Sequence, residues 1–457
     1  MRPDSSKGGA TALIDMSARV RSLPGPSWAA GSVVDDLCMG RGVVWAFPRP
    51  APAIELITET VDRLYDAGIE THVVRVSEHV DPEGGKARQR DMPALEDTIR
   101  KVTGKAAPRE LLDGKFTPVV TVFDALDICD EVAQKAVDVG MMTTLREWAV
   151  QSREDYRRTG IFAGVMLVTT GSVAAHVAPD NDCLRTRWHW GTVTVAELCL
   201  LAREIAADLK LGWERSTWMQ WVGSEVAGTD PALLVHLCEQ WEPAEGMSQL
   251  INVLCSYAMR QGWTAKDYAS VPRNLGEPFT PGRTRRPPCP PEHLAALYDL
   301  GMLDWEAERG LRLHSAALAL AGDVTEISHR VWAGQAGCLL PLFDRERLEI
   351  CRRLDEESGG WRNWCARTED RNCSGLAVFN DSGADQAVDE GTPVMEFADI
   401  RQYLSCNRNR STAALLKRVD FLTKARNCLA HYTPLSWENF SAALKWHGSA
   451  EEFAGKG

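Results

Sequence analysis

TPVVTVF, residues 117–123, is an almost unbroken run of β-branched and aromatic residues. A run without alternating polar positions is typical of a strand that is buried on both faces of a sheet. Three similar runs occur elsewhere in the first half of the chain, at residues 42–47, 71–76 and 163–168. Apolar residues at helical spacing separate them, at 53–67, 92–102 and 130–157. Strands that alternate with helices predict an α/β fold with a parallel sheet and crossover helices.

Length and composition set the class of protein. The 457 residues allow about two to four domains of ordinary size. The net charge of −12 argues against a broad nucleic-acid footprint but leaves room for a local basic groove. Thirteen cysteines without a CxxC pair indicate reduced thiols, and neither a disulfide framework nor a zinc site. Residues 1–10 lack the apolar core of a signal peptide and no run reaches transmembrane length, so we expect a cytoplasmic protein.

Three places in the α/β region can be tested for nucleotide chemistry. The loop after the first strand reads Ala-Phe-Pro-Arg-Pro-Ala-Pro-Ala at residues 46–53. It has no glycine, lysine or hydroxyl where a phosphate loop needs them, and its prolines remove amide donors, so it is unfit to cradle phosphates. Asp124 follows the buried strand as a Mg²⁺-binding aspartate would, with Ala125 in place of a catalytic glutamate. Thr169 opens a polar turn after the next strand.

In this order, the altered phosphate loop, Asp124 and Thr169 resemble an AAA/STAND-type P-loop NTPase domain that has lost its Walker A motif. The resemblance covers roughly residues 30–280 and includes Asp230-Pro231, which is similar to the turn that opens a lid helix in that family. It implies a vestigial ATP/Mg²⁺ site at Asp124 and Thr169, with little or no ATP hydrolysis. From the residues alone, Asp124 is equally well an ordinary helix cap, and Thr169 equally well belongs to an ordinary turn.

Composition also predicts the domain boundaries. Residues 292–326 predict a short helix, a hairpin and a second helix, which resembles a small winged helix, and their mixed surface charge favours a packing role over DNA binding. The full expected order is a Gly-, Ser- and Pro-rich arm (1–29), a degenerate P-loop NTPase-like α/β domain (30–222), a helical lid (223–281), a Pro/Arg linker (282–291), the winged-helix-like module (292–326), a helical bundle (327–448) and a tail (449–457).

Four helical patterns make up the last domain, at residues 329–357, 394–404, 411–431 and 436–445. Pro341 should kink or divide the first of them. A Gly-, Asp- and Asn-rich loop over residues 359–393 separates the first from the second. Four helices with one long connection predict a small up-down bundle, so the whole chain is expected to be multidomain, α/β followed by all-α.

The third of these helices ends in Lys-Ala-Arg-Asn-Cys-Leu-Ala-His, residues 424–431. Its buried stripe is predicted at Leu415, Val419, Leu422 and Leu429. Arg426 lies on that stripe, where a guanidinium group needs a partner or a polar cleft. Asn427 and His431 are four residues apart on an adjacent face, and with Arg426 they fall within about 140° of arc. The spacing predicts that these three side chains line one groove at the helix end.

An R-N-x-x-x-H motif at the end of the penultimate helix of such a bundle resembles the catalytic signature of HEPN-superfamily ribonucleases, over about residues 328–446. The resemblance implies that two copies pair, with both motifs facing one cleft, and cut single-stranded RNA without a metal ion. Arg426 would stabilise the phosphorane charge, His431 would act as acid and base around the attacking 2′-hydroxyl, and Asn427 would orient the histidine or the phosphate. The products would carry a 2′,3′-cyclic phosphate.

The spacing by itself is not specific, because Arg309 and His314 also fit R-x4-H. In the structural alternative, Arg426 pairs with Glu346 or Glu396. His431 then only caps the helix C-terminus, where a cation is favourable.

Together these features predict a cytoplasmic, regulated, metal-independent endoribonuclease whose inactive AAA/STAND-like module controls a HEPN-like domain, in a prokaryotic defence or toxin–antitoxin system. The expected partners are RNA, a second copy of the chain and a protein of the same operon, with no membrane and no required cofactor. The alternative is a non-catalytic scaffold or nucleotide-sensing subunit that assembles a defence complex.

Overall fold

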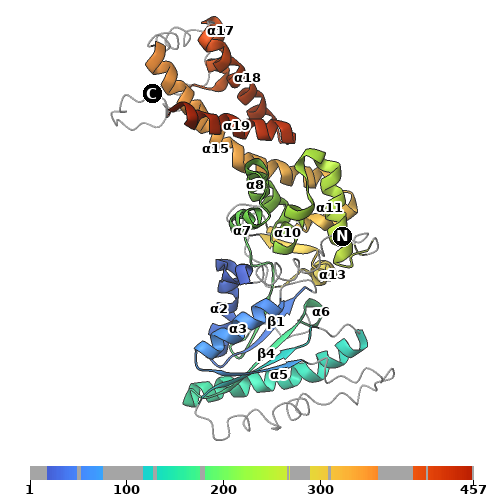
Figure 1. Cartoon of the computed structure of the whole chain (residues 1–457). Coiled ribbons are helices and arrows are strands. Elements are labelled where there is room, and N and C mark those ends of the chain that lie inside the picture. The colour runs from blue at the N-terminus through green and yellow to red at the C-terminus, as the bar shows by residue number, and fades with distance from the viewer. Residues whose placement is uncertain are drawn as a thin grey trace, which may run out of the picture. The chain divides into compact units, whose positions relative to one another are not determined.

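The structure is a computed structural model of the chain (Figure 1). It describes residues 18–48, 53–75, 117–126, 131–174, 181–264, 267, 289–306, 310–358, 395–407 and 410–454. Four predicted features lie wholly or mostly outside the described residues. They are the helix at 92–102, the loop at 49–52, the linker at 282–291 and the long loop at 359–393.

Five parallel strands form the sheet of the α/β part (Figure 1). They are β1 (Gly42–Phe47), β2 (Glu70–Arg75), β3 (Val119–Asp124), β4 (Ala163–Thr170) and β5 (Leu184–Trp188). Their order across the sheet is β2-β3-β4-β1-β5, and every neighbouring pair is parallel. The prediction of an α/β fold with a parallel sheet is confirmed, and such a sheet is compatible with a P-loop-like domain.

Strand β5 is the strand that the hydrophobic pattern does not predict. Its sequence is Leu-Arg-Thr-Arg-Trp, and the three central residues are polar and half-buried. β5 lies at the edge of the sheet and pairs only with β1, so its side chains need not be apolar.

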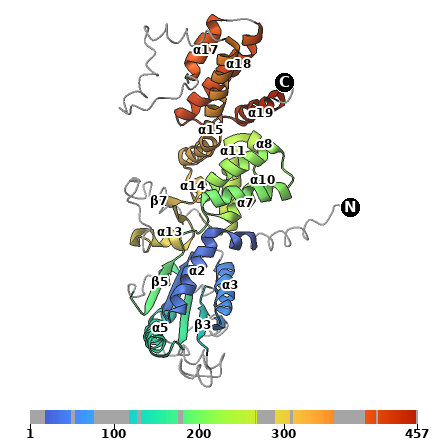
Figure 2. The same cartoon turned by 90° about the vertical axis from the view of Figure 1, so that its left-hand side faces the viewer.

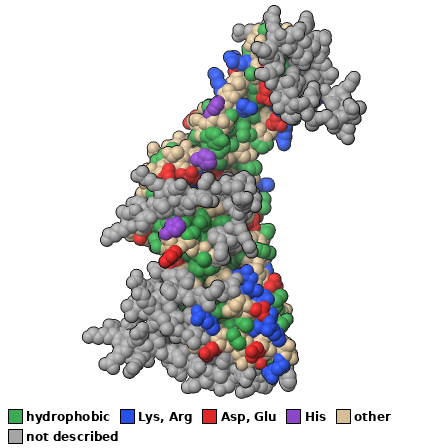
Figure 3. Space-filling model, turned by 180° about the vertical axis from the view of Figure 1, so that it is seen from behind, with side chains coloured by type: hydrophobic (Ala, Val, Ile, Leu, Met, Phe, Trp, Pro, Cys, Tyr) green, Lys and Arg blue, Asp and Glu red, His purple; other side chains and the backbone are tan. Residues whose placement is uncertain are grey.

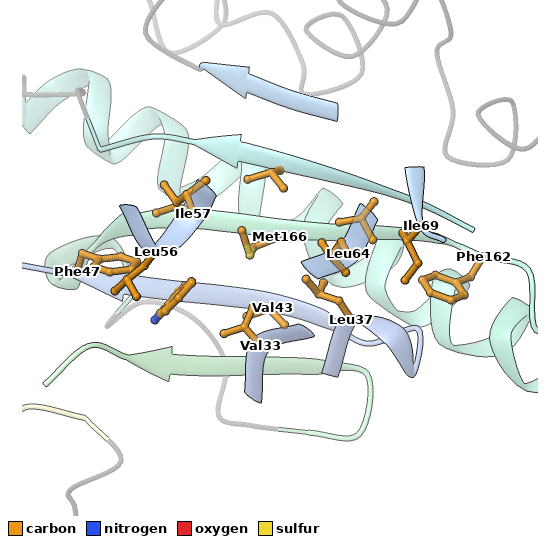
Figure 4. Packing of buried hydrophobic residues seen from close by; sticks show 14 residues of the cluster. Val33, Leu37, Val43, Phe47, Leu56, Ile57, Leu64, Ile69, Phe162 and Met166 are labelled. Atoms are coloured by element: carbon orange, nitrogen blue, oxygen red, sulfur yellow. The ribbon is translucent and has the colours of Figure 1, made fainter. Parts of the chain in front are cut away.

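Helices cover both faces of this sheet. α2 (Pro24–Cys38) and α3 (Ala53–Asp66) bring Leu37, Leu56 and Leu64 into one buried cluster with Val43 of β1 (Figure 4). α5 (Glu131–Thr159) contributes Trp148 to a second cluster. Successive residues of β1 belong alternately to the two clusters, because neighbouring side chains of a strand point to opposite faces.

Helix α2 begins at Pro24, so residues 24–29 belong to the folded domain and not to the predicted arm. Proline suits the first turn of a helix because its φ is already helical and its missing N–H has no partner there. The amide of Gly25 donates to Oε1 of Glu197 at 2.6 Å, and a Cβ at Gly25 would lie 1.8 Å from the carbonyl oxygen of Thr192. The glycine is therefore required by close packing, which the composition of the segment does not reveal.

The chain divides into two compact units. The first comprises residues 1–201, 227–233 and 255–321, and the second comprises 202–226, 234–254 and 322–457. The segment predicted as a lid contributes to both units. The helices between the sheet and residue 260 are α6 (Gly171–Ala174), α7 (Val195–Asp208), α8 (Trp213–Trp218), the π-helical η3 (Met219–Gly223), α9 (Ser224–Ala227), α10 (Pro231–Gln240), the 3₁₀ turn η4 (Pro243–Glu245) and α11 (Gly246–Arg260).

The module predicted at residues 292–326 contains the expected short helices and hairpin. They are η5 (Glu292–Leu294), α13 (Ala295–Asp299), β6 (Leu303–Glu306), β7 (Gly310–Leu313) and α14 (Ser315–Ala321). β6 and β7 pair antiparallel, which confirms the hairpin. Its assignment as a winged helix stays a prediction.

Four helices fill the C-terminal part of the second unit (Figure 2). They are α15 (Val324–Ser358), α17 (Phe397–Cys406), α18 (Arg410–Ala430) and α19 (Trp437–Ala454). α18 packs against each of the other three. α15 continues through Pro341, so the helix is not divided there, and the alternative expectation of a kink stays a prediction. None of the helices in the described part of the chain is long and apolar enough to cross a membrane.

Candidate functional site

The buried stripe of α18 differs from the predicted one. Val419, Leu422, Ala425 and Leu429 are buried, whereas Leu415 is half-buried and Arg426 is exposed. Ala425 takes the core position, and one further step of about 100° turns Arg426 towards solvent. The prediction that Arg426 lies on the apolar stripe is therefore wrong. The large apolar residues alone do not reveal that Arg426 is exposed, because the core position beside it is taken by the small side chain of Ala425.

Arg426, Asn427 and His431 are all solvent-exposed at the C-terminal end of α18. Among the described residues, none of the three side chains has a hydrogen-bond or ion-pair partner. The carboxylates suggested for Arg426 bind other arginines. Arg418 pairs with Glu346, and Nη1 of Arg347 lies 3.1 Å from Oε1 of Glu396. Those two ion pairs therefore do not account for Arg426.

The end of α18 is closed by a Schellman motif. The amide of Thr433 donates to the carbonyl of Cys428 at 2.9 Å, and the amide of Tyr432 donates to that of Leu429 at 3.2 Å. Tyr432 has a φ of +58°, in the left-handed region where glycine is the usual residue. The motif ends the helix directly after Ala430 and places His431 and Tyr432 at the surface.

Two side chains of α15 bind the backbone at this helix end and just after it. The indole Nε1 of Trp332 donates to the carbonyl of Leu429 at 2.6 Å. Gln335 is fully buried and binds both backbone groups of Leu435. Its Nε2 donates to the Leu435 carbonyl at 2.9 Å, and its Oε1 accepts from the Leu435 amide at 2.7 Å. The segment that carries His431 is thus fixed on both sides.

An aromatic cluster lies directly beside His431. The ring centroid of Tyr432 is 4.6 Å from that of Trp332 and 6.2 Å from that of His329, and the rings of His329 and Trp332 are 4.9 Å apart. Tyr432 and His329 are exposed, and Trp332 is half-buried beneath them. Sequence reasoning did not identify this cluster, because residues 329 and 332 lie about 100 positions before Tyr432.

These groups have a defined chemical capacity. A guanidinium group can donate two hydrogen bonds to a phosphate, and an imidazole can act as a general base or a general acid. A carboxamide can orient either of them. The three side chains could therefore act together on a phosphodiester.

The predicted vestigial nucleotide site is brought together on adjacent strands. Asp124 of β3 is in register with Val168 of β4, next to Thr169. The Oδ1 atom of Asp124 accepts a hydrogen bond from the amide of Leu126 at 3.2 Å, as in an ordinary turn. The hydroxyl of Thr169 is buried without a partner among the described residues.

The carboxyl edge of the sheet is closed where a ligand would be expected. The connections from β1 and β4 lead in opposite directions, and ligands of open α/β sheets bind at such a switch point. Here the hydroxyl of Tyr298, from α13, lies 3.0 Å from the carbonyl oxygen of Ala46 and 2.8 Å from that of His189. A Cβ at Gly171 would lie 2.6 Å from the Tyr298 ring. Among the described residues, Tyr298 therefore occupies part of the edge at which a nucleotide would bind.

A small cavity of about 70 Å³ lies near this edge, lined by residues that include Pro48, Asp230, Tyr257, Asp304 and His314. Pockets for nucleotide-sized ligands have volumes of roughly 300–1,000 Å³. The cavity can therefore hold a few water molecules but no nucleotide. Its residues come from segments spread between residues 48 and 314, so the sequence pattern did not reveal it.

A hydrogen-bond network forms the polar wall of this cavity. Nε2 of His314 lies 3.2 Å from Oδ2 of Asp230, and the Tyr257 hydroxyl donates to the same oxygen. Nδ1 of His314 accepts from the amide of Ala316, so Nε2 carries the proton that faces Asp230. Burial alone would raise the pKa of Asp230, but the hydrogen bonds from His314 and Tyr257 hold it below its ordinary value. Burial and the charge of Asp230 raise the pKa of Asp304 to about 6.

Asp230 also caps α10, as predicted. Its Oδ1 accepts from the amide of Ala232 at 2.8 Å, and Pro231 is the first residue of the helix. His314 is buried in this network, and Arg309 lies outside the described residues. The second R-x4-H match therefore offers no exposed histidine.

A cluster of arginines gives the α/β part a local basic surface. Arg41 and Arg187 bind Asp36, and Arg41, Arg153 and Arg157 bind Asp182. The hydrogen bond from Arg153 and the neighbouring positive charges hold the pKa of Asp182 below its ordinary value. Figure 3 shows Lys and Arg side chains gathered on one face of this part. Such a surface can attract an anionic partner although the whole chain is acidic.

Comparisons with known proteins do not assign the chain to a family. No protein-family model and no curated protein matches the sequence. Among solved structures, a RuvB mutant of Thermotoga maritima is similar over 65% of this chain and 92% of its own, with 9% sequence identity and a TM-score of 0.28. A likeness at this score carries no argument about the present chain.

Proposed function

We propose that this protein is a regulated, metal-independent endoribonuclease of the HEPN type, and that its α/β part is a regulatory module without ATPase activity. One observation carries the proposal. Arg426, Asn427 and His431 are exposed at one fixed helix end and have no side-chain partner among the described residues, while Glu346 and Glu396 pair with other arginines. An arginine and a histidine exposed together at one fixed helix end are available to bind a phosphodiester and to transfer its protons.

The proposed reaction is a transesterification within RNA. The 2′-oxygen attacks the adjacent phosphorus and loses its proton to a base, and the bond from phosphorus to the 5′-oxygen breaks while that oxygen gains a proton. His431 of one copy acts as base, and the histidine of a second copy acts as acid across a shared cleft. Arg426 stabilises the charge that builds up on the phosphoryl oxygens, and Asn427 orients the phosphate. The products carry a 2′,3′-cyclic phosphate and a 5′-hydroxyl.

Regulation would act on the pairing of the two motifs. The closed carboxyl edge around Tyr298 and the proline-containing loop after β1 support a module that does not hydrolyse ATP. A partner protein or a signal that brings two copies together would switch cleavage on, as suits a prokaryotic defence or toxin–antitoxin system.

Cleavage of RNA by single-site variants tests the proposal. The full-length protein is incubated with 5′-labelled single-stranded RNA in the presence of EDTA, and the ends of the products are identified by mass spectrometry. Arg426→Ala and His431→Ala should each lower the cleavage rate by at least about 100-fold. The matched controls Arg401→Ala and His293→Ala, which change exposed residues elsewhere, should retain it. Equal rates in wild type and the two motif variants would contradict the proposal.

A non-catalytic scaffold is the second candidate, and exposed tryptophans favour it. Trp28 is 71% exposed and Trp213 is 53% exposed, although indole rings usually lie in cores or interfaces. If binding of a partner subunit is lost in Trp28→Ala or Trp213→Ala and is insensitive to Arg426→Ala, the scaffold function is the correct one. The nucleotide-sensing variant of this alternative predicts heat of binding for ATP and Mg²⁺ by calorimetry.

A further inference from the structure

We propose that the exposed ring of Tyr432, supported by Trp332 and His329, is a stacking platform for a base of single-stranded RNA. The platform would hold the nucleotide next to the phosphodiester that faces His431. The inference rests on the proposed function, because it assigns the substrate-positioning surface of the same site.

The first argument is the conformation of Tyr432. Its φ of +58° is unfavourable for a residue with a Cβ, and glycine is the usual choice at this position of a Schellman motif. Its side chain is nevertheless 67% exposed, so burial of the ring does not explain why tyrosine stands there. A bulky residue that neither suits the backbone nor fills a core indicates a task at the surface.

The second argument is the rigidity of the ring. Tyr432 lies against Trp332 with ring centroids 4.6 Å apart, and Trp332 is itself held by its bond to the carbonyl of Leu429. His329 stacks on Tyr432 at an interplanar angle of 22°. A ring that is already ordered loses little conformational entropy when a ligand binds.

The third argument is the chemistry around the ring. Residues 421–434 contain the cations Lys424 and Arg426 and no aspartate or glutamate, so the helix end is complementary to a polyanion. Proteins bind unpaired RNA by stacking bases on aromatic rings while cationic side chains bind phosphates. An exposed aromatic ring beside His329, on a segment that also carries exposed Arg426 and His431, fits this ligand better than it fits an apolar protein surface.

Binding is measured in the His431→Ala background, so that the RNA is not cut. The probe is a fluorescein-labelled 12-nucleotide oligouridylate, and fluorescence anisotropy gives its affinity. Relative to Tyr432→Phe, which keeps the ring, Tyr432→Gly should bind about fivefold to a hundredfold more weakly. The same two variants should bind an abasic oligonucleotide equally. Tyr65→Ala removes another exposed tyrosine ring, which is 78% exposed, and serves as the control with unchanged affinity.

Thermal unfolding separates this role from a structural one. Tyr432→Gly relieves the left-handed backbone, so its melting temperature should equal or exceed that of Tyr432→Phe. Any of three results would overturn the platform. The two variants could bind oligouridylate equally, Tyr432→Gly could also bind the abasic probe more weakly than Tyr432→Phe does, or Tyr432→Gly could have the lower melting temperature. The nuclease proposal fails separately, if cleavage does not depend on Arg426 and His431 although binding still depends on Tyr432.

Discussion

Replacing Gln335 by methionine tests how firmly the helix end that carries His431 is held. Methionine keeps the length of the side chain but removes both polar atoms. The amide and the carbonyl of Leu435 then lose their partners at a site where Gln335 is fully buried. Each backbone group of Leu435 that is left buried without a partner costs about 1–3 kcal/mol. The side-chain carboxamide of Gln335 no longer has to be desolvated, which offsets about 1–2 kcal/mol of this cost. Two such groups together cost about 2–6 kcal/mol, so the net loss in the free energy of local opening is about 0–5 kcal/mol, with a midpoint near 2.5 kcal/mol.

Hydrogen exchange measured by mass spectrometry reads out this opening in the full-length protein. Protection of the backbone amides over residues 429–436 should fall by about 60-fold at this midpoint, since 1.4 kcal/mol corresponds to a factor of ten. RNA cleavage should fall with it, because the segment next to His431 would no longer be fixed.

Gln249 is the matched control, because it makes the same pair of bonds at a more exposed place. Its Nε2 donates to the carbonyl of Gln240 at 2.7 Å, and its Oε1 accepts from the amide of Glu242 at 3.1 Å. Water can replace these bonds. Gln249→Met should therefore lower the free energy of local opening of the segment around residue 245 by less than about 1 kcal/mol. Unchanged protection in Gln335→Met, or an equal loss in the control, would refute the reasoning.

Two further predictions concern the α/β unit. Asp36→Asn removes a buried carboxylate that binds Arg41 and Arg187. It should lower the free energy of unfolding by about 1–3 kcal/mol, measured by urea denaturation, because both arginines stay partly solvated; an unchanged value would contradict it. Asp304 has a folded-state pKa raised to about 6, so the folded state binds its proton more tightly than the unfolded state, and stability is lost as pH rises through that value. The melting temperature of Asp304→Asn minus that of wild type should therefore increase from pH 4.5 to pH 7. A difference between the two proteins that does not change with pH would refute this.

The sequence by itself determined the elements whose pattern is local. Runs such as residues 119–124 are apolar on both faces and can only be central strands, and the periodicity of residues 411–431 is that of a helix. The Asp230-Pro231 helix start is equally local, since a cap and its amide lie within one turn. The pattern did not predict strand β5, because its polar residues are tolerated at the edge of the sheet. It did not predict the start of α2, because Gly25, which permits close packing, is also a typical linker residue.

Tertiary structure alone decided what surrounds each polar group. Arg426 is exposed because Ala425 takes the core position and because Arg418 and Arg347 bind the available carboxylates. Tyr298 closes an edge of the sheet more than 250 residues away along the chain, and Gln335 fixes a segment 100 residues further on. Such contacts depend on how elements pack, and packing follows from the shapes of whole surfaces. A one-dimensional pattern therefore identifies a motif such as Arg426-Asn427-His431. It does not identify the distant groups that hold the helix end in place, or show that these three side chains are exposed.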